Sequence, residues 1–569
     1  MTVREFDNRR NVYTSKDLTA SYPAPIQQRS SRHIPRRAMP VAVASVLLFL
    51  SGCTSLREWC GDGFKVGPHY CPPTAPIEEH WIDANDPHVV SQARDYAYWW
   101  TVFQDPVLDQ LIQAASRDNI SLQTAGFRIL EARAQRDIVT GNLFPQQQQA
   151  TGSYQHGQLS QQAYPYNIIG GAFPGFPYHY DAWSAGLGAS WELDFWGKFR
   201  RGIEAADASL QAQIEDYDNV LVLLQAEVAS NYVQMRTFDQ RLKLARENVA
   251  LQNQSLHVVQ DRFQAGLVTE LDLQQAKYNL ANTEALLPNF ETGRRQAQNR
   301  LCTLMGCPPH DIAAELGLSP TVPAAPQEVV VGIPAGLLAR RPDVRRAERQ
   351  AAAQSARIGI AKADFYPQIA ITGSISYQAE NLPALFTPGS LAGTVGPAFQ
   401  WNILAYGRIL NNVRVQDARF QQAILTYRDV VLKAHEEVED SIVAFLHEQQ
   451  RAQSLEESAT ASARSTHLAL RQYERGLINF QPLLDSQRVL VLSQDTLAES
   501  RGLVSVNLVA VYKALAGGWT SRLAANPGTA PRTAAPAEEL PASNNHSSSA
   551  AGVRAGDAPP APIPPKPAQ

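Results

Sequence analysis

The chain has little that would suit it to nucleic acid or to catalysis. Its 569 residues carry 50 Lys and Arg against 54 Asp and Glu, and this balance gives no basic surface for nucleic acid. Ser nucleophile elbows, phosphate-binding loops and dinucleotide fingerprints are missing, and His435-Glu436-Glu437 lacks the second histidine of a zinc-binding helix. We therefore predict a protein that is not an enzyme and that uses no cofactor and no metal.

Long hydrophobic runs are also missing. Residues 41–50 are apolar, but ten residues are too few to span a bilayer as a helix, and no other run approaches about 18 residues. If this chain crosses a membrane, it must do so by strands.

The short apolar run nevertheless has the form of a secretory signal. Arg36 and Arg37 precede it, and it ends in Leu50-Ser51-Gly52-Cys53. This ending resembles a bacterial lipobox, in which the Cys53 thiol would be acylated and become the new N-terminus. A short N-terminal anchor is the alternative.

Cysteine is scarce, with five in the chain. Besides Cys53, Cys60 and Cys71 could form a disulfide in an oxidising compartment or remain thiols. Cys302 and Cys307 stand where a helix ends before Pro308-Pro309. Their four intervening residues fit no strong zinc motif, so we interpret them as structural.

The most informative feature of the chain is an internal duplication. A shift of 210 positions lays Trp191 on Trp401 and Gly266 on Gly476 without a gap. Within each copy, apolar residues recur every seven positions, which predicts two long helices packed along coiled-coil-like seams, 197–266 and 407–476. Each would measure roughly 100 Å at 1.5 Å per residue and turn back at its glycine.

Before each long helix lie segments that alternate apolar with polar or small residues. Such alternation predicts strands around 183–193, 368–377 and 395–403, and we expect a fourth at 147–156, where polarity hardly alternates. Alternation of this kind is the weak signature of an outer membrane barrel. Four strands cannot close a barrel, and open edges do not occur in lipid. Three copies of the chain would supply twelve strands and a closed wall.

Several motifs together resemble one known family. Gly332-Ile333-Pro334 followed by Leu338-Ala339-Arg340-Arg341-Pro342-Asp343-Val344-Arg345, then Asp194-Phe195-Trp196-Gly197-Lys198 and Val66-Gly67-Pro68, resemble the TolC-like outer membrane factors, in particular the lipoprotein branch that serves multidrug efflux. The resemblance implies a mixed α and β fold: a homotrimer with a 12-stranded β-barrel in the outer membrane, continued by a long α-helical periplasmic barrel built from two internal repeats.

The resemblance also implies partners and a gate. A periplasmic adaptor and an inner-membrane pump would meet the hairpin turns at Gly266, Leu267, Gly476 and Leu477, and outer membrane lipid would surround the barrel. Family members close the tip with carboxylates and a tyrosine, which Asp272, Asp485 and Tyr473 match. The alternative is that both carboxylates favour a helix start and that Tyr473 is a heptad core residue. Ile478 and Pro482 depart from the family pattern, which predicts a less ionic gate.

Two further residue sets have both a functional and a structural interpretation. We expect a structural role for Arg340, Arg341, Pro342 and Asp343, because Pro342-Asp343 suits a helix start. An aromatic girdle at the membrane interface, or packing inside a soluble sheet, would account for Trp183, Trp191, Trp401 and Tyr377.

Together these features predict the outer membrane channel of a tripartite efflux pump, a passive duct for small molecules. A type I protein secretion exit duct and a periplasmic coiled-coil scaffold without a pore are the alternatives. The expected organisation, in order, is a leader and signal (1–52), a lipidated arm (53–104), repeat 1 (105–310), a linker (311–342), repeat 2 (343–520) and a disordered Ala/Pro-rich tail (521–569).

Overall fold

The computed structural model describes residues 56–90, 96–312, 321–331 and 340–522. The predictions for Cys53, for the leader, for most of the C-terminal tail and for Gly332-Ile333-Pro334 lie outside these residues. The contacts divide the chain into two compact units that interleave along the sequence: Met1–Glu78, Gln123–Tyr217 and Leu338–His435 form the first, and the remainder forms the second.

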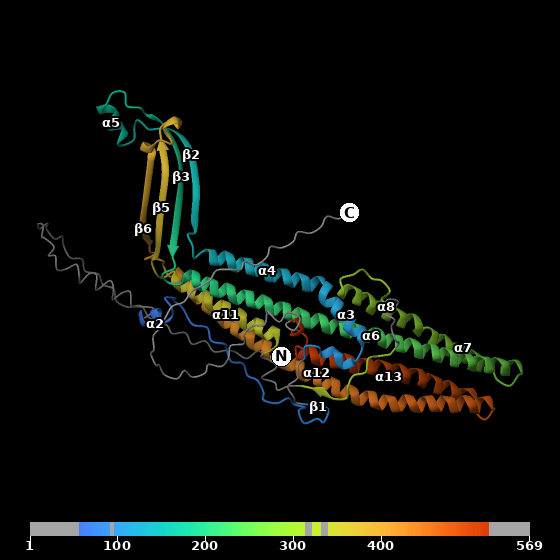
Figure 1. Cartoon of the computed structure of the whole chain (residues 1–569). Coiled ribbons are helices and arrows are strands. Elements are labelled where there is room, and N and C mark those ends of the chain that lie inside the picture. The colour runs from blue at the N-terminus through green and yellow to red at the C-terminus, as the bar shows by residue number, and fades with distance from the viewer. Residues whose placement is uncertain (1–55, 91–95, 313–320, 332–339, 523–569) are drawn as a thin grey trace, which may run out of the picture. The chain divides into compact units, whose positions relative to one another are not determined.

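The first unit contains an antiparallel sheet of four strands, and these strands lie side by side in Figure 1. Their order is β2-β3-β5-β6. A short helix, α5 (Tyr166–Ala172), lies in the connection after β2, and two 3-10 turns, η2 (Leu382–Ala384) and η3 (Pro388–Ser390), lie between β5 and β6. The strands are β2 (Gln147–Gln158), β3 (His179–Leu193), β5 (Gln368–Ala379) and β6 (Leu391–Gln400).

The register of the sheet aligns the alternating residues of its strands. Leu187 pairs with Ile375, and Trp191 pairs with Ile371. Gly373 in turn pairs with Val395. Because successive side chains point to opposite faces, one face collects the apolar residues of β3, β5 and β6, and the other collects Ser, Thr, Gly and small residues. The apolar face is exposed in the single chain: Val395 is 83% exposed.

The last predicted strand needs one correction. Trp401 and Ile403 were expected within it, but β6 ends at Gln400. The indole nitrogen of Trp401 instead donates to Phe365 O at 3.0 Å, which holds Trp401 against the end of the preceding helix. Pro397 does lie within β6, where an edge strand tolerates a residue without an amide hydrogen.

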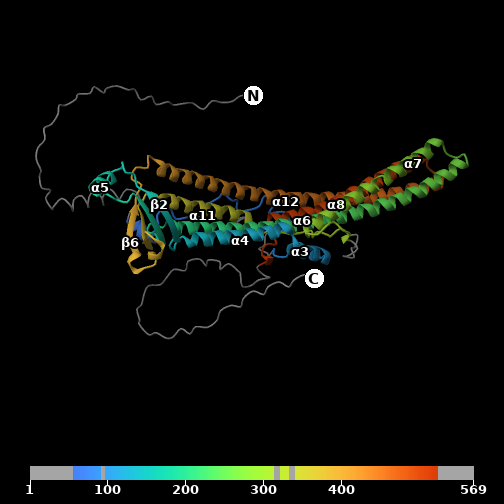
Figure 2. The same cartoon turned by 90° about the horizontal axis from the view of Figure 1, so that it is seen from above.

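Three helices lie along one another in the first unit (Figure 2). They are α4 (Ile120–Gly141), α11 (Pro342–Ala363) and the first part of α6 (Lys198–Gln264). Arg136 Nε contacts Asp207 Oδ1 at 2.9 Å between α4 and α6, and Arg346 Nη1 contacts Asp216 Oδ1 at 2.8 Å between α11 and α6. Charged pairs therefore set the register of helices whose contact faces are otherwise rich in alanine.

The second unit is built from long helices that run out and return. Both α6 and α12 (Arg408–Glu474) have 67 residues, as the heptads predict. The seam positions Val228 and Met235 of α6, and Val438 and Phe445 of α12, are buried. The other helices of the second unit are α3 (Pro106–Asp118), α7 (Glu270–Glu284), α8 (Leu286–Leu304) and α13 (Phe480–Ala514). This unit also contains the 3-10 turn η1 (Trp99–Phe103) and the parallel strand pair β1 (Val89–Val90) and β4 (Val329–Val330). The short helix α2 (Leu56–Gly61) belongs to the first unit.

One long return helix is interrupted. The leucines at 273, 280, 287 and 301 predict that the chain returns as helix after Gly266, and the structure divides this return, because α7 ends at Glu284 and α8 begins at Leu286. Pro288 follows in the first turn of α8, and a proline has no amide hydrogen and clashes with the carbonyl four residues earlier, here that of Glu284. The other return helix, α13, has its proline, Pro482, in the first turn, where it is tolerated.

Asp105, Tyr232 and Arg236 join α3 to α6. Asp105 caps α3 by accepting from Val107 N at 2.9 Å, and it also accepts from the Tyr232 hydroxyl at 2.7 Å. Arg236, fully buried, donates from Nε and Nη2 to the same hydroxyl at 3.1 and 2.9 Å. Burial raises the pKa of Tyr232, and the hydrogen bond to Asp105 adds to this rise.

Among the described helices, none combines the length and the apolar character that crossing a membrane requires. The described residues include four cysteines, and none of them forms a disulfide: Cys60, Cys71, Cys302 and Cys307. Cys60 and Cys71 therefore do not pair with each other.

Candidate functional site

The first long hairpin turns at Gly266, between α6 and α7. Its φ of +71° lies in the left-handed region, which a residue with a side chain adopts only with strain. Leu267 N donates to Arg262 O at 2.8 Å and thereby closes the end of α6. The Leu267 side chain is 74% exposed, so the turn presents an apolar residue to solvent.

The second long hairpin, between α12 and α13, repeats this geometry. Gly476 has a φ of +73°, and Leu477 N donates to Gln472 O at 2.9 Å. Leu477 is 69% exposed. The two turns that the duplication predicts thus have the same backbone and the same exposed leucine.

Asp272 lies in the first turn of α7, where it forms a capping box with Thr269. Its Oδ2 accepts from Thr269 N at 3.0 Å and from Thr269 Oγ1 at 2.8 Å, while Asp272 N donates back to Thr269 Oγ1. A capping box satisfies two amide groups that a helix start otherwise leaves without partners. The structure therefore supports the helix-start role of Asp272.

Asp485 lies one turn into α13 and is exposed. Its two oxygens accept from Gln481 Nε2 at 3.0 and 3.1 Å, and Arg488 Nη1 lies 3.9 Å away. Arg488 also lies over the ring of Tyr278 on α7, 5.7 Å from its centroid. Asp485 caps no helix, because Asn479 is the residue before α13, and its charge remains available at the surface.

Tyr473 is almost fully buried, in the apolar cluster beneath the two turns. Its ring contacts Phe480 at a centroid distance of 5.6 Å, and the Arg262 guanidinium lies 4.5 Å above it. The hydroxyl forms no hydrogen bond of regular geometry within the described residues. Burial raises the pKa of Tyr473, the Arg262 charge opposes this, and the Asp272 charge adds to it. The cluster comprises Val259, Leu273, Ala276, Leu470, Tyr473, Phe480, Leu483 and Leu484.

Arg262 and Arg488 are the tip residues that the sequence analysis missed. Arg262 joins the hairpins, because it comes from α6, covers Tyr473 of α12 and donates to Glu474 O at 3.2 Å. Their positions in the sequence could have indicated a place at the tip, because Arg262 stands four residues before Gly266 and Arg488 three residues after Asp485. The tip therefore has cations, although Ile478 and Pro482 themselves are uncharged.

The predicted aromatic residues lie at two ends of the sheet. Near one end, Trp183 contacts Tyr154 at a centroid distance of 4.4 Å and Tyr377 contacts Phe386 at 5.5 Å. At the other, the indole of Trp191 donates to Leu143 O at 3.0 Å, the same bond that Trp401 makes with Phe365 O. Both acceptors stand two residues before a proline that ends a helix, so the duplicated tryptophans have duplicated partners.

The arginine-rich motif is a helix start, as predicted. Pro342 is the first residue of α11, and the buried Arg341 donates to both oxygens of Asp343 at 3.1 and 2.8 Å. Arg340 is exposed beside it. Arg345 continues the motif by pairing with Glu215 of α6 at 2.6 Å.

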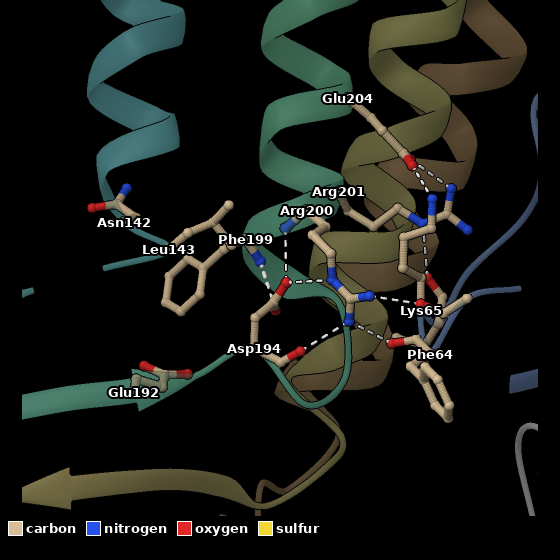
Figure 3. A network of polar contacts seen from close by, with 12 residues as sticks. Phe64, Lys65, Asn142, Leu143, Glu192, Asp194, Phe199, Arg200, Arg201 and Glu204 are labelled. Atoms are coloured by element: carbon tan, nitrogen blue, oxygen red, sulfur yellow. Dashed lines mark hydrogen bonds and ion pairs between the residues drawn. The ribbon is translucent and has the colours of Figure 1, made fainter. Parts of the chain in front are cut away.

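A polar network joins two motifs that are far apart in the sequence (Figure 3). Asp194 accepts from Phe199 N at 3.0 Å and from Arg200 Nε at 2.9 Å, and so shapes the turn into α6. Arg200 then donates to Phe64 O at 2.8 Å. Its neighbour Arg201 donates to Val66 O at 3.0 Å and pairs with Glu204, which also pairs with Lys65.

Close backbone approach explains the glycines of these motifs. A Cβ on Gly197, whose φ is +77°, would lie 2.7 Å from Lys65 Cα. A Cβ on Gly67 would lie 2.5 Å from Gly359 Cα on α11. The two glycines thus let the backbone of the N-terminal segment approach the start of α6 and the backbone of α11 closely.

Three features of this chain together define the class of TolC-like channel proteins. They are alternating strands with one exposed apolar face, two long hairpins with matching turns, and an N-terminal segment bound to the helices. The outer membrane efflux protein model matches residues 111–307 and 333–517. The chain belongs to the outer membrane efflux protein family.

Known proteins resemble the chain over most of their length. It is 30% identical to nodulation protein T of Rhizobium leguminosarum bv. trifolii, over 80% of this chain and 92% of that protein. It is 28% identical to the probable outer membrane lipoprotein SilC of Salmonella typhimurium, over 84% and 98%. The solved outer-membrane channel OprN superposes with a TM-score of 0.73 at 31% identity, over 80% of this chain and 99% of OprN.

These similarities confirm the predicted function and location. The chain is the outer membrane channel component of an efflux pump, with its helical part extending into the periplasm. The family consists of channels and not of enzymes. It favours the efflux function over the protein secretion duct and over a scaffold without a pore.

Proposed function

We propose that three copies of this chain form a 12-stranded barrel through which small molecules leave the cell passively. The main observation in support of this proposal is the register of the sheet, which gathers the apolar residues of β3, β5 and β6 on one exposed face. Such a face suits lipid, and the opposite face of Ser, Thr and Gly suits a water-filled lumen. Each of β2 and β6 has one neighbour in the described sheet, so a second and a third copy would supply the missing partners.

The positions of the aromatic residues support this barrel. Trp183 and Trp191 are eight residues apart on β3, a separation of about 27 Å along the strand at 3.3–3.4 Å per residue, or about 20 Å along the barrel axis at the usual strand tilt. Barrels carry an apolar band of about 25 Å between two aromatic girdles. Trp183 and Tyr377 would lie in one girdle, and Trp191 and Trp401 in the other.

Conductance of the purified trimer in a planar bilayer tests the proposed duct. We expect stable single-channel currents that are absent without protein. Protein that remains monomeric in detergent, or a trimer that carries no current under any condition, would contradict the proposal.

We further propose that Asp272, Asp485 and Tyr473 restrict the periplasmic end of the duct. Like charges from three chains repel and select ions where water is confined. Asp485 is the better placed carboxylate because it is exposed and not needed as a cap. Tyr473 would act through packing, since it is buried beneath Arg262.

Neutral amides separate charge from capping at this gate. Asp272→Asn keeps an oxygen that can accept from Thr269, and we expect Asp272→Asn with Asp485→Asn to raise conductance in planar bilayers. Asp429→Asn is the control, because Asp429 is an exposed carboxylate on α12, paired with Lys433, far from the turn in sequence. Unchanged conductance in the double variant would remove the electrostatic role of these carboxylates.

The two turns would receive a periplasmic adaptor, which in turn connects the duct to an inner-membrane pump. Leu267 and Leu477 support this docking, because each is an exposed apolar side chain on a rigid turn. Gly266 and Gly476 would shape the surface without contacting the partner themselves.

We also propose that Cys53 carries the lipid anchor. The sequence Leu50-Ser51-Gly52-Cys53 and the similarity to SilC, a probable outer membrane lipoprotein, support it. Labelled palmitate should be incorporated into the wild-type protein and not into Cys53→Ala, so the variant should be absent from the labelled protein. Equal labelling of both proteins would place the modification elsewhere.

A further inference from the structure

Three metal-ligating side chains meet where α8 ends. One ligand atom each from Cys302, Cys307 and His310 lies within 4.8 Å of the others. The spacing of the two cysteines alone predicts no metal. The third ligand becomes visible when the chain folds back: Cys307 N donates to Cys302 O at 3.0 Å, and Gly306 reverses the direction with a φ of +74°.

The distances are close to those of a coordinated ion. His310 Nδ1 lies 3.8 Å from Cys302 Sγ and 3.9 Å from Cys307 Sγ. In a tetrahedral zinc site, with about 2.3 Å to sulfur and about 2.0 Å to nitrogen, a sulfur and a nitrogen lie about 3.5 Å apart. A side-chain adjustment of a few tenths of an ångström would bring His310 Nδ1 to both sulfurs, and the two sulfurs already lie within 4.8 Å of each other.

A fully buried amide holds the loop that carries His310. Gln298 lies one turn before Cys302 on α8, and its Nε2 donates to His310 O at 2.7 Å and to Asp311 Oδ1 at 2.9 Å. Gly306 has no room for a side chain, because a Cβ there would lie 2.3 Å from Asp118 O. The backbone of the cluster is therefore ordered before any ion arrives, as a binding site requires.

The burial of the three ligands leaves the cluster open on one side. Cys302 is buried, Cys307 is half-buried and His310 is exposed. An ion would thus rest on the helix end and face solvent past the imidazole. Water could complete the fourth position.

We propose that Cys302, Cys307 and His310 bind a thiophilic closed-shell cation, Zn²⁺ or Cu(I), which fastens the end of α8 to the loop after it. Two sulfurs and one imidazole suit such ions and disfavour Mg²⁺ and Ca²⁺, which take oxygen ligands. On binding, both thiols release their protons, and His310 carries its proton on Nε2, so that the Nδ1 lone pair faces the ion. The contact of Nδ1 with Pro308 O at 2.9 Å is then given up.

Cobalt titration of the full-length, phosphine-reduced trimer in detergent tests this site. One Co²⁺ per chain should produce a thiolate-to-cobalt charge-transfer band, and added Zn²⁺ should abolish it. Cys302→Ser or His310→Ala should weaken binding by more than about 100-fold, since loss of an outer-shell partner alone costs about 10–100-fold. Cys60→Ser with Cys71→Ser is the matched control and should retain the band, because these exposed cysteines lie on the N-terminal segment.

His310→Ala keeps the result interpretable if a cysteine variant fails to fold, since His310 is exposed. Zn²⁺ should raise the melting temperature of the wild type and leave that of His310→Ala unchanged. Competition against a Cu(I)-specific chelator distinguishes the two ions, and retention of either supports the site. The proposal is overturned if reduced protein shows no cobalt band, if the band survives Cys302→Ser, or if mass spectrometry finds a Cys302–Cys307 disulfide that reductant cannot open.

Discussion

Single polar side chains fasten the ends of the helices in this protein. The indoles of Trp191 and Trp401 each bind a carbonyl at the end of a preceding helix. Asp105 caps α3 and receives the Tyr232 hydroxyl, while Asp194 and Arg200 shape the start of α6. Hydrogen bonds to charged groups contribute more than neutral ones, and losing one partner leaves the other buried without compensation.

Removing the Tyr232 hydroxyl should destabilise the second unit. In Tyr232→Phe, Arg236 loses two hydrogen bonds inside the protein and Asp105 loses one, which should cost roughly 1–3 kcal/mol. Thermal unfolding in detergent measures the effect. Tyr278→Phe is the control, because Tyr278 is exposed, and the two variants melting alike would show that the buried network contributes nothing.

The ion pairs of Glu204 should make the N-terminal attachment sensitive to acid. Burial raises the pKa of Glu204, but Lys65 and Arg201 outweigh it, so the pKa lies below its usual value of 4.5. A lowered pKa contributes stability above the unfolded value, and this contribution is lost as the pH falls through the folded value. Glu204→Gln should therefore lower the melting temperature at pH 7 and have no effect well below pH 4.5. An effect that grows on acidification would contradict this sign.

The long helices differ in how completely their seams are buried. Along α12, Val431, Val438, Phe445, Thr466 and Tyr473 are all buried, whereas α6 ends in Phe263, which is 39% exposed. Phe263 and Tyr473 occupy equivalent positions of the duplication, so the two hairpins are not interchangeable at their tips. The common features are the glycine turns.

Alanine at either turn glycine should loosen the tip. A left-handed conformation costs a residue with a side chain about 1–2 kcal/mol, and Gly266 has no neighbour within 4 Å that would add a clash. Hydrogen exchange across residues 262–270 should rise in Gly266→Ala, and the equivalent segment should respond in Gly476→Ala. Gly141→Ala, at the end of α4 with an ordinary φ and open space, is the control. Equal exchange in all three would exclude strain at the turns.

For the whole molecule, the proposed trimer depends on a sheet whose apolar face is exposed in the single chain. Leu187, Ile375, Val395 and Phe399 are each at least half exposed. A face of this kind is a liability in water and an advantage in lipid. The neighbouring residues on the same strands point the other way and are small or polar, which provides a test within one strand.

Lysine on the two faces of β6 should have opposite consequences. Val395→Lys would bury a charge in lipid and cost about 2–4 kcal/mol near the midplane. Thr394→Lys, one residue earlier, would face the lumen and should be tolerated. The measurement is the fraction of heat-modifiable, detergent-resistant trimer in the outer membrane. Equal losses in both variants would contradict the proposed orientation of the sheet.

Much of the fold could be predicted from the sequence, because periodicity is a local property of the chain. The seven-residue spacing and the 210-residue shift predict two helices that both prove to have 67 residues, and the glycines mark both turns. Alternation predicts three of the four strands and hardly marks the one at 147–156. It also could not show that Trp401 leaves the last strand for Phe365 O. Pro288, which interrupts the return helix, was visible in the sequence, but the heptad pattern alone continues through it.

The side-chain clusters, in contrast, were decided by the tertiary structure. Arg262 over Tyr473, Asp105 with Tyr232 and Arg236, and His310 beside Cys302 and Cys307 each depend on chain segments that meet only after folding. No spacing rule specifies such contacts, because the direction of a side chain follows from the packing of the helices that carry it. The sequence by itself determined the lengths and turns of the elements, and folding determined which charges, rings and sulfurs lie together.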